Sequence, residues 1–363
     1  MFFQKPRIFR LDENWEWPDI CVIIPAYQEA DILAEKVQNT LSLDYPGNKK
    51  IVVITDGSTD QSEAILHSFL MVKHLHQPDR KGKLAALDRA VRLADAPLIV
   101  GTDANALLTK ESLVNMIAHF ADPRVGGVAG EKQILSPGAD AAAGSGEGLY
   151  WRYENLLKRW DSETGTVVGA AGELFAFRKD LYEFLPADTI IEDFVQSVSL
   201  VGKGYRVVFE PKAVATEYAS ASVREELKRK IRIAAGGIQA SWRLRYLLNP
   251  FRYGWFSIQL FSHRVMRWTL APLSLVVVFL SNMWLVWQEK HFAFDILLVL
   301  QLTFYLLAIL GALTAKRKIR WKFLYAPYYF CVMNYAAMAG WIRYALGTQS
   351  AVWEKARRHT PHP

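Results

Sequence analysis

Hydrophobic and polar residues follow one pattern in the first two thirds of the chain and another in the last third. Before about residue 260, short apolar runs alternate with polar segments, whereas long apolar runs dominate afterwards. The runs at 20–25, 51–54 and 97–101 contain no charged residue, which is typical of strands buried on both faces of a parallel sheet. Apolar residues at helical spacing lie between the first two runs. This order predicts an α/β domain with a doubly wound, mostly parallel sheet.

Weaker patterns extend this predicted domain. We expect further strands at 72–76 and 125–130, and the stretch 167–177 has the composition of a strand interrupted by two glycines. The Gly-, Ala- and Ser-rich stretch 136–148 predicts a loop, and the aromatic stretch 149–160 predicts a helix.

The last third of the chain predicts a membrane region. Apolar segments occur at 268–287, 292–315 and 323–346, and each has roughly the 20 residues that a bilayer crossing requires. Tyr and Trp at their ends suit the membrane interface. Before them, 223–248 has the pattern of a basic helix that lies in the interface. A soluble core would have to hold three long, almost uncharged helices in succession, which we consider the weaker interpretation.

The net charge of +7 is concentrated in basic stretches that flank the apolar segments. This placement favours an anionic membrane surface over nucleic acid as the partner. The two cysteines lie in a predicted buried strand and in an apolar segment, so a disulfide framework is not expected and a reducing compartment is favoured. The first residues lack the apolar run of a secretory signal, and we expect no cleaved signal peptide.

The charge rule for membrane proteins gives an expected orientation. The basic stretch 316–320 belongs on the cytoplasmic side, which two crossings reach if the preceding α/β domain is cytoplasmic. A third crossing would place the basic C-terminus outside, against the rule, so the last apolar segment either crosses or is re-entrant or interfacial. We therefore divide the chain into a cytoplasmic catalytic domain (1–222), interfacial helices (223–264), a transmembrane region (265–347) and a basic tail (348–363), in the cell (inner) membrane.

Several polar residues follow the predicted strands directly. Because the carboxyl ends of parallel strands meet at one edge of a sheet, we expect Tyr27, Glu29, Asp56, Lys83 and Asp103 to gather there. Carboxylates suit a base and a ribose, and a lysine suits phosphate charge, so this set favours a nucleoside diphosphate. Each of these side chains can instead cap a helix or face solvent.

Asp103 and Asn105 form a candidate metal site. Residues two apart in an extended segment point the same way, so both oxygens can face one hard cation such as Mg²⁺ or Mn²⁺. The alternative is a strand that ends in a turn whose polar side chains cap the backbone. Neither a G-x-G-x-x-G sequence after the first strand nor a Walker lysine loop is present, which disfavours a dinucleotide cofactor.

Glu192 and Asp193 form a candidate acid–base pair between apolar neighbours. An apolar surround raises the pKa of a carboxyl group and makes it a better proton acceptor. The alternative is an ordinary helix start, where acids interact favourably with the helix dipole.

The ordered motifs resemble the family 2 glycosyltransferases of the GT-A fold, in their membrane-bound, polysaccharide-synthesising branch. The resemblance extends over about residues 20–239 and rests on Pro25-Ala26-Tyr27-Gln28-Glu29, Asp56-Gly57-Ser58, Lys81-Gly82-Lys83, Thr102-Asp103-Ala104-Asn105 and Ile191-Glu192-Asp193. It implies inverting transfer from a nucleotide sugar, usually a UDP-sugar, to a glycan or lipid-linked acceptor at the membrane.

The resemblance also implies roles for individual residues. Pro25, Ala26, Tyr27, Glu29 and Asp56 match donor-binding positions, of which the last three match nucleoside contacts. Lys83 matches a position near the base and diphosphate, and Asp103 matches the first acid of the metal motif. Asp193 matches the catalytic base, with Glu192 beside it.

Two departures from the family pattern concern the metal and the acceptor. Asn105 stands where the metal motif has a second acid, so it offers an oxygen without a charge. The stretch Arg229-Lys230-Ile231-Arg232-Ile233 replaces the Q-x-x-R-W motif of processive members and keeps only its arginine. Arg232 can still face the diphosphate leaving group, whereas the missing Trp argues against long-chain synthesis.

Two other functions remain open from the sequence. One is a catalytically silent, sugar-nucleotide-binding subunit of a polysaccharide assembly system; the retained Asp103 and Asp193 argue against it. The other is a nucleotidyltransferase, which would carry a Gly-rich, Arg-containing loop where Ala26-Tyr27-Gln28-Glu29-Ala30 stands.

Overall fold

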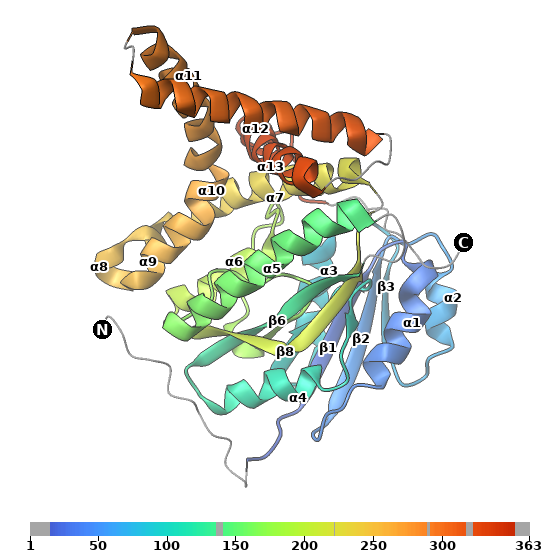
Figure 1. The fold of residues 1–363 in the computed structure, drawn as a ribbon. Helices are drawn as coiled ribbons and strands as arrows, with labels where there is room; N and C mark the ends of the chain where they lie inside the picture. The colour runs from blue at the N-terminus through green and yellow to red at the C-terminus, as the bar shows by residue number, and fades with distance from the viewer. Residues whose placement is uncertain (1–14, 136–140, 221, 289–290, 317–321, 353–363) are drawn as a thin grey trace.

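The computed structural model describes residues 15–135, 141–220, 222–288, 291–316 and 322–352. Its centre is an eight-stranded sheet with the strand order β3-β2-β1-β4-β7-β6-β8-β5 (Figure 1). The strands are β1 (Ile20–Ala26), β2 (Lys49–Asp56), β3 (Lys73–Gln77), β4 (Leu98–Gly101), β5 (Leu107–Leu108), β6 (Val125–Leu135), β7 (Phe175–Arg178) and β8 (Arg206–Tyr218).

The sheet is parallel in its first half and mixed beyond it. β1 pairs in parallel with both β2 and β4, and β2 pairs in parallel with β3. β7 then runs antiparallel to its neighbours β4 and β6, while β6 and β8 are parallel to each other. The α/β, doubly wound prediction is confirmed, with a parallel half that brings the ends of β1, β2 and β4 to one edge.

Alternate residues of β1 serve two separate cores, as a strand buried on both faces requires. Ile20, Val22 and Ile24 belong to one cluster with residues of α1 (Ala30–Leu41) and α4 (Ser112–Ile117). Cys21 and Ile23 belong to the other cluster with residues of α3 (Lys83–Leu93). Helices therefore cover both faces of the sheet, which explains the uninterrupted apolar pattern of its first strands.

Three expectations about local structure need correction. The helix α5 (Ala141–Thr164) begins inside the stretch that we expected to be a loop, and 136–140 lie outside the described residues. In 167–177 only the last three residues belong to a strand, β7. The long strand β8 has no counterpart among the predicted elements. Glycine and alanine content misled the first expectation, because tertiary contacts between α5 and the β6–β8 pair stabilise that helix.

The helices after the sheet form a separate layer above it (Figure 1). They are α7 (Val223–Arg243), α8 (Pro250–Tyr253), α9 (Trp255–Leu260), α10 (Met266–Trp268), α11 (Leu270–Gln288), α12 (Phe292–Lys316) and α13 (Lys322–Ala345). The helix α6 (Glu192–Gly202) precedes β8 and packs on the sheet, and the short α2 (Ser62–His67) lies beside α1. The expected basic helix corresponds to α7.

In the described part of the chain, two helices rather than three are long and apolar enough to cross a membrane. These are Leu270–Gln288 and Phe292–Thr314, and only 11% of each apolar window is buried inside the protein. Such exposure of apolar helices is expected when lipid covers them. These two helices are therefore candidate membrane spans.

The third expected span, α13, instead packs along α7 and against α12. The approach to α7 is close, because a Cβ placed at Gly340 would lie 2.6 Å from the Cβ of Ala234. After α13 the chain returns to the catalytic domain, where a Cβ at Gly82 would lie 3.5 Å from Val352 Cγ2. These contacts favour the re-entrant or interfacial alternative for the last apolar segment over a third crossing. The basic stretch 317–321 and most of the basic tail lie outside the described residues.

We expect the end of α13 and the catalytic domain to share one side of the membrane, because two crossings return the chain to its starting side. Leu70, in the domain that contains the sheet, and Leu346, after α13, are 96% and 69% exposed. Each is replaced by a single cysteine. In a Cys331→Ser background, an impermeant maleimide should treat the two cysteines alike: it should label both in intact cells, or both only after the cells are permeabilised. A cysteine replacing Gln288, at the far end of α11, is the control and should label in the opposite preparation. Labelling of Leu346→Cys together with Gln288→Cys would contradict this topology.

Candidate active site

The turns after β1 and β2 are joined by side-chain hydrogen bonds at the sheet edge. The Gln28 backbone N–H donates to Ser58 Oγ (3.1 Å), and the Ala30 N–H donates to Asp60 Oδ2 (2.9 Å). Gln28 itself has a positive φ of 57°, a conformation that costs a non-glycine residue about 1–3 kcal/mol. Its strained turn leads into α1, where the backbone carbonyl of the buried Glu29 accepts the first helical hydrogen bonds.

Asp56, at the end of β2, holds the loop that leads into α3. Its carboxylate accepts from the N–H of Gly82 (2.6 Å) and from the N–H of Lys81 (3.0 Å to Oδ2). In the same loop, the Arg80 guanidinium lies 3.7 Å from the centre of the Tyr27 ring. The two expected nucleoside contacts, Tyr27 and Asp56, are thus brought together by the 80–82 loop, which fixes where α3 begins.

Lys83, the first residue of α3, joins two of the candidate acids. Its Nζ lies 2.7 Å from Asp103 Oδ1 and 3.2 Å from Glu192 Oε1. Burial lowers the pKa of Lys83, but the carboxylates of Asp103, Glu192 and Asp193 outweigh burial and hold its pKa well above the ordinary value. The ammonium is therefore charged throughout the physiological range.

An acidic cluster surrounds Asp103. Carboxylate oxygens of Asp103, Glu173 and Glu217 lie within 4.8 Å of one another, and the buried Lys132 forms ion pairs with both glutamates. Burial raises the pKa of Asp103 although the ion pair with Lys83 opposes this. Glu173 Oε2 is buried and has no hydrogen-bond partner among the described residues. Hard oxygen donors with one unsatisfied buried oxygen fit a divalent cation such as Mg²⁺ or Mn²⁺.

Asn105 lies in a turn and not in the extended segment that we expected. The Ala106 N–H donates to the carbonyl of Asp103 (3.2 Å), and the residues between them form the turn. The i, i+2 argument for a shared cation is therefore wrong in its premise. The oxygens that the structure brings beside Asp103 come from Glu173 and Glu217, and a metal contact by Asn105 stays a prediction.

Asp193 lies in the first turn of α6 and is fixed by two backbone donors. Its Oδ2 accepts from the Gly172 N–H (2.6 Å), and its Oδ1 accepts from its own helix at the Phe194 N–H (2.8 Å). Burial and, next, the charge of Glu192 raise the pKa of Asp193 to about 6. A carboxyl group with such a pKa is ionised near neutral pH and is still basic enough to accept a proton.

Arg232 reaches the segment before α6 from the basic helix α7. Its Nη1 donates to the carbonyl of Ile190 (2.9 Å). The contact joins α7 to the segment two residues before Glu192.

Five of the candidate residues line one small cavity. Its volume is about 40 Å³, and it lies among the ends of β1 and β4, the start of α3 and the start of α6. The candidate residues in its wall are Pro25, Lys83, Asp103, Glu192 and Asp193. Tyr27, Glu29, Asp56 and Arg232 do not line it; the first three lie along the adjoining turns described above.

The sequence pattern did not identify Gly172, Glu173, Lys132 or Glu217 as site residues. Gly172 is needed for space, because a Cβ there would lie 2.6 Å from Lys83 Nζ and 3.2 Å from Asp193 Oδ2. The adjacent Gly172-Glu173 pair before an apolar run was the available signal. Lys132 and Glu217 had none, since β6–β8 pairing brings them together across a long sequence separation.

Comparison with solved structures identifies the fold. In structure, the chain is similar to a mannosyltransferase from Pyrobaculum calidifontis solved with GDP-Man and Mn²⁺, with a TM-score of 0.70 and 23% identity. The likeness covers 95% of this chain and 91% of that one. The fold is thus the GT-A fold of glycosyltransferases.

Sequence comparison points to the same kind of protein. Residues 21–185 match the description "Glycosyl transferase family 2". Two relatives are poly-beta-1,6-N-acetyl-D-glucosamine synthases, from Staphylococcus epidermidis (25% identical over 65% of this chain) and Staphylococcus aureus (26% over 61%). The matched region spans 60% and 55% of those two proteins. Over residues 21–185 the chain is therefore similar to the family 2 glycosyltransferases, and the relatives that it resembles are polysaccharide synthases.

Asp56→Ala should destabilise the protein by about 1–3 kcal/mol, because it leaves the Lys81 and Gly82 N–H groups without their acceptor. The midpoint of thermal unfolding in detergent should fall by several degrees. Asp95→Ala is the matched control, since the Asp95 side chain is 85% exposed and its ion pair with Lys50 is 3.5 Å long. That variant should lose less than about 1 kcal/mol. Equal midpoints for the two variants would show that Asp56 does not hold the loop.

Proposed function

We propose that this protein is an inverting glycosyltransferase that moves a sugar from a UDP-sugar to a hydroxyl of a glycan or lipid-linked acceptor. The observation that carries the proposal is the single cavity in which Asp193, a carboxyl group of raised pKa, lies near the charged Lys83–Asp103 pair. A general base and a cation for a diphosphate are the two groups that such a transfer requires. The names of the relatives support N-acetylglucosamine as the first donor sugar to test.

Donor binding is assigned to the edge formed by β1, β2 and β4. Tyr27, Glu29 and Asp56, together with Pro25 and Ala26, would contact the nucleoside side. Lys83 would pair with the diphosphate, since its ammonium remains charged and reaches the cavity. Asp103, with Glu173 and Asn105, would hold Mg²⁺ or Mn²⁺, which would neutralise diphosphate charge when bound.

Asp193 is assigned the proton transfer. The acceptor hydroxyl gives its proton to the Asp193 carboxylate as its oxygen bonds to the anomeric carbon. The bond from that carbon to the diphosphate breaks on the opposite side, and the configuration inverts. Lys83 and Arg232 supply positive charge for the departing diphosphate. Glu192 pairs with Lys83 and contributes to the raised pKa of Asp193.

The proposed orientation places this chemistry on the cytoplasmic side of the inner membrane. The basic residues of α7 suit the anionic inner surface. The loss of the Trp of the Q-x-x-R-W motif, replaced by Ile233, favours transfer of one or a few sugars over processive synthesis.

Purified protein should release UDP from UDP-N-acetylglucosamine or a related UDP-sugar in the presence of Mg²⁺ or Mn²⁺. Release should stop in excess EDTA and return when the metal is restored, because the acidic cluster needs a cation to accept a diphosphate. A GDP-sugar is the donor control. Release at the full rate in EDTA would reject the metal role. UDP binding without release from any donor, including GDP-mannose, would favour the catalytically silent alternative.

Asp193→Asn should lower kcat by roughly 10²- to 10⁴-fold, the usual effect of removing a general base. The Kd of the UDP-sugar should change little, because Asp193 is assigned to the acceptor side. Asp188→Asn, which changes an exposed acid that pairs with Arg243, is the matched control. Near-normal turnover of Asp193→Asn would reject the assignment, and loss of donor binding would make Asp193 a donor-site residue and Glu192 the next candidate.

The pH profile gives an independent check on the base. Because Asp193 must be ionised and its pKa is about 6, kcat/KM should fall about tenfold per pH unit below 6 and level off above 7. In Glu192→Gln the loss of a neighbouring negative charge should move this limb to lower pH. A limb that does not move would mean that another group controls it.

A further inference from the structure

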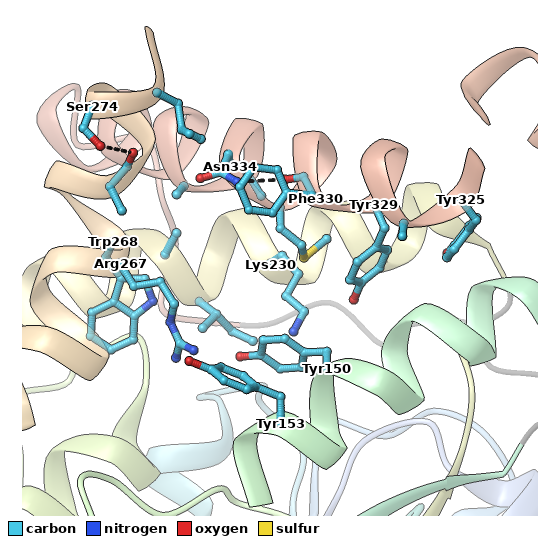
Figure 2. Close-up of a pocket in the computed structure, with 18 of the residues that line it drawn as sticks. Tyr150, Tyr153, Lys230, Arg267, Trp268, Ser274, Tyr325, Tyr329, Phe330 and Asn334 are labelled. Carbon is cyan, nitrogen blue, oxygen red and sulfur yellow. Dashed lines mark hydrogen bonds between the residues drawn. The ribbon is translucent and has the colours of Figure 1, made fainter. Parts of the chain in front are cut away.

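A second and larger cavity, of about 760 Å³, lies between the catalytic domain and the membrane-side helices. Its walls come from α5, α7, the segment from α10 into α11, and α13, and Figure 2 shows these helices around it. None of the residues lining this cavity lines the donor cavity. Its size is within the usual range for small-molecule sites, about 300–1,000 Å³.

The cavity is polar at one end and apolar at the other. Toward α5, the amine of Lys230 and the guanidinium of Arg267 point to the rings of Tyr150 and Tyr153 (Figure 2). Toward α11 and α13, the wall consists mainly of apolar side chains, among them Ala271, Leu275, Phe330, Met333 and Ala337. An elongated ligand that fits both ends must itself be amphiphilic.

Lys230 is the side chain at the polar end whose charge is not balanced by a direct partner. It is 9% exposed, and in the described part of the chain it forms neither an ion pair nor a hydrogen bond. Its Nζ lies 3.4 Å from the centre of the Tyr150 ring. By contrast, Arg229 pairs with Glu147 and Arg267 pairs with Glu154. A buried ammonium without an acceptor is unfavourable, and an anion placed beside it would remove that penalty.

The charges near Lys230 support an anionic ligand. Burial and the neighbouring Arg229 lower the pKa of Lys230 to about 7, and the carboxylate of Glu226 only partly opposes them. The Oε1 of Glu226 accepts a hydrogen bond from the Tyr329 hydroxyl and so is directed at α13. A phosphate at the polar end would meet Lys230 and Arg267 together, with tyrosine hydroxyl groups beside them.

We propose that this cavity binds a lipid with an anionic phosphate head group. The head would lie at Lys230 and Arg267, and the hydrocarbon would extend along the apolar wall between α11 and α13. The surrounding helices favour a lipid, because α11 is one of the two helices that are exposed and apolar enough to lie in a bilayer. A glycan would need hydrogen-bonding groups along its whole length, and the far wall offers few of them.

The position of the cavity relates it to the acceptor side of the active site. Trp268 lines the cavity and packs edge-on against Phe194, with ring centres 5.3 Å apart. Phe194 follows Asp193 directly. The lipid head group would therefore lie next to the α6 segment that carries the proposed base. The binding site itself does not depend on the proposed transfer, so its test uses neither donor nor turnover.

The test is the affinity of the full chain, in neutral detergent, for defined amphiphiles, measured by native mass spectrometry. Dodecyl phosphate should bind at one molecule per chain and at least tenfold more tightly than dodecanol, which has the same chain without the charge. Inorganic phosphate alone should not compete at the same concentration. Binding of phosphatidylglycerol as tightly as dodecyl phosphate would identify a bilayer phospholipid as the source; preference for dodecyl phosphate would identify a lipid monophosphate.

Variants locate the site. Lys230→Met should weaken dodecyl phosphate about tenfold or more, and Lys230→Arg should retain binding. Lys228→Met, on the same helix, is the matched control, because Lys228 is half exposed and pairs with Glu225. Ser274→Trp, at the apolar end, should also weaken binding by occupying the space of the hydrocarbon. Thermal unfolding of each variant checks that it is folded.

Three results would overturn the proposal. They are equal affinity for dodecyl phosphate and dodecanol, an unchanged affinity in folded Lys230→Met, and displacement of the amphiphile by an oligosaccharide. The last result would assign the cavity to a glycan. If no UDP is released, the proposed transfer is rejected, but these binding measurements still decide whether the cavity holds a lipid phosphate.

Discussion

The ammonium of Lys83 is the group on which the geometry of the active site depends. Lys83 is the first residue of α3, and its ammonium pairs with Asp103 after β4 and with Glu192 at the start of α6. It therefore joins three elements that are distant in the sequence. Without this ammonium, the carboxylates of Asp103, Glu192 and Asp193 would lie together in a largely buried space with no positive charge between them. Like charges in such a space disfavour ionisation. Asp56 fixes the loop just before Lys83, and Gly172 leaves room for its Nζ. The sheet thus positions the charge, and the charge opposes the increase that burial causes in the pKa values of Asp103 and Asp193.

Next to the Lys83–Asp103 ion pair, the fold contains further buried lysines, whose burial by itself lowers stability. Lys132 lies between Glu173 and Glu217, and Lys36 donates to Thr102 Oγ1 (2.9 Å) and to the carbonyl of Ala106. Ion pairs in a protein interior often return no more than their desolvation cost. Apolar packing alone would stabilise the fold as well, so stability does not explain these groups. They surround the turn that contains Asp103, and we infer that they hold this turn in place.

Sequence patterns predicted the parts of the protein that depend on local order. The strands β1, β2 and β4 are uninterrupted apolar runs, and their ends carry Tyr27, Asp56 and Asp103 as expected from parallel pairing. Glu217 and Lys132 could not be predicted, because they meet only through the register of β6 with β8. The apolar content of α13 left a membrane crossing and a re-entrant or interfacial position open. In the structure Tyr329 and Gly340 contact α7, and hydropathy does not reveal such contacts.

Helix α7 links the larger cavity to the segment before α6, and its periodicity explains how. Successive residues of an α-helix are rotated by about 100°, so residues two apart point to nearly opposite sides. Arg232 donates to the carbonyl of Ile190 beside the catalytic segment, whereas Lys230 points into the larger cavity. The same helix is held on its outer side by Gly340 of α13 and approaches Trp268 at Gly237, where a Cβ would lie 2.3 Å from the indole ring. A ligand bound at Lys230, as proposed, would therefore contact the same helix whose Arg232 donates to the segment that leads into Glu192 and Asp193.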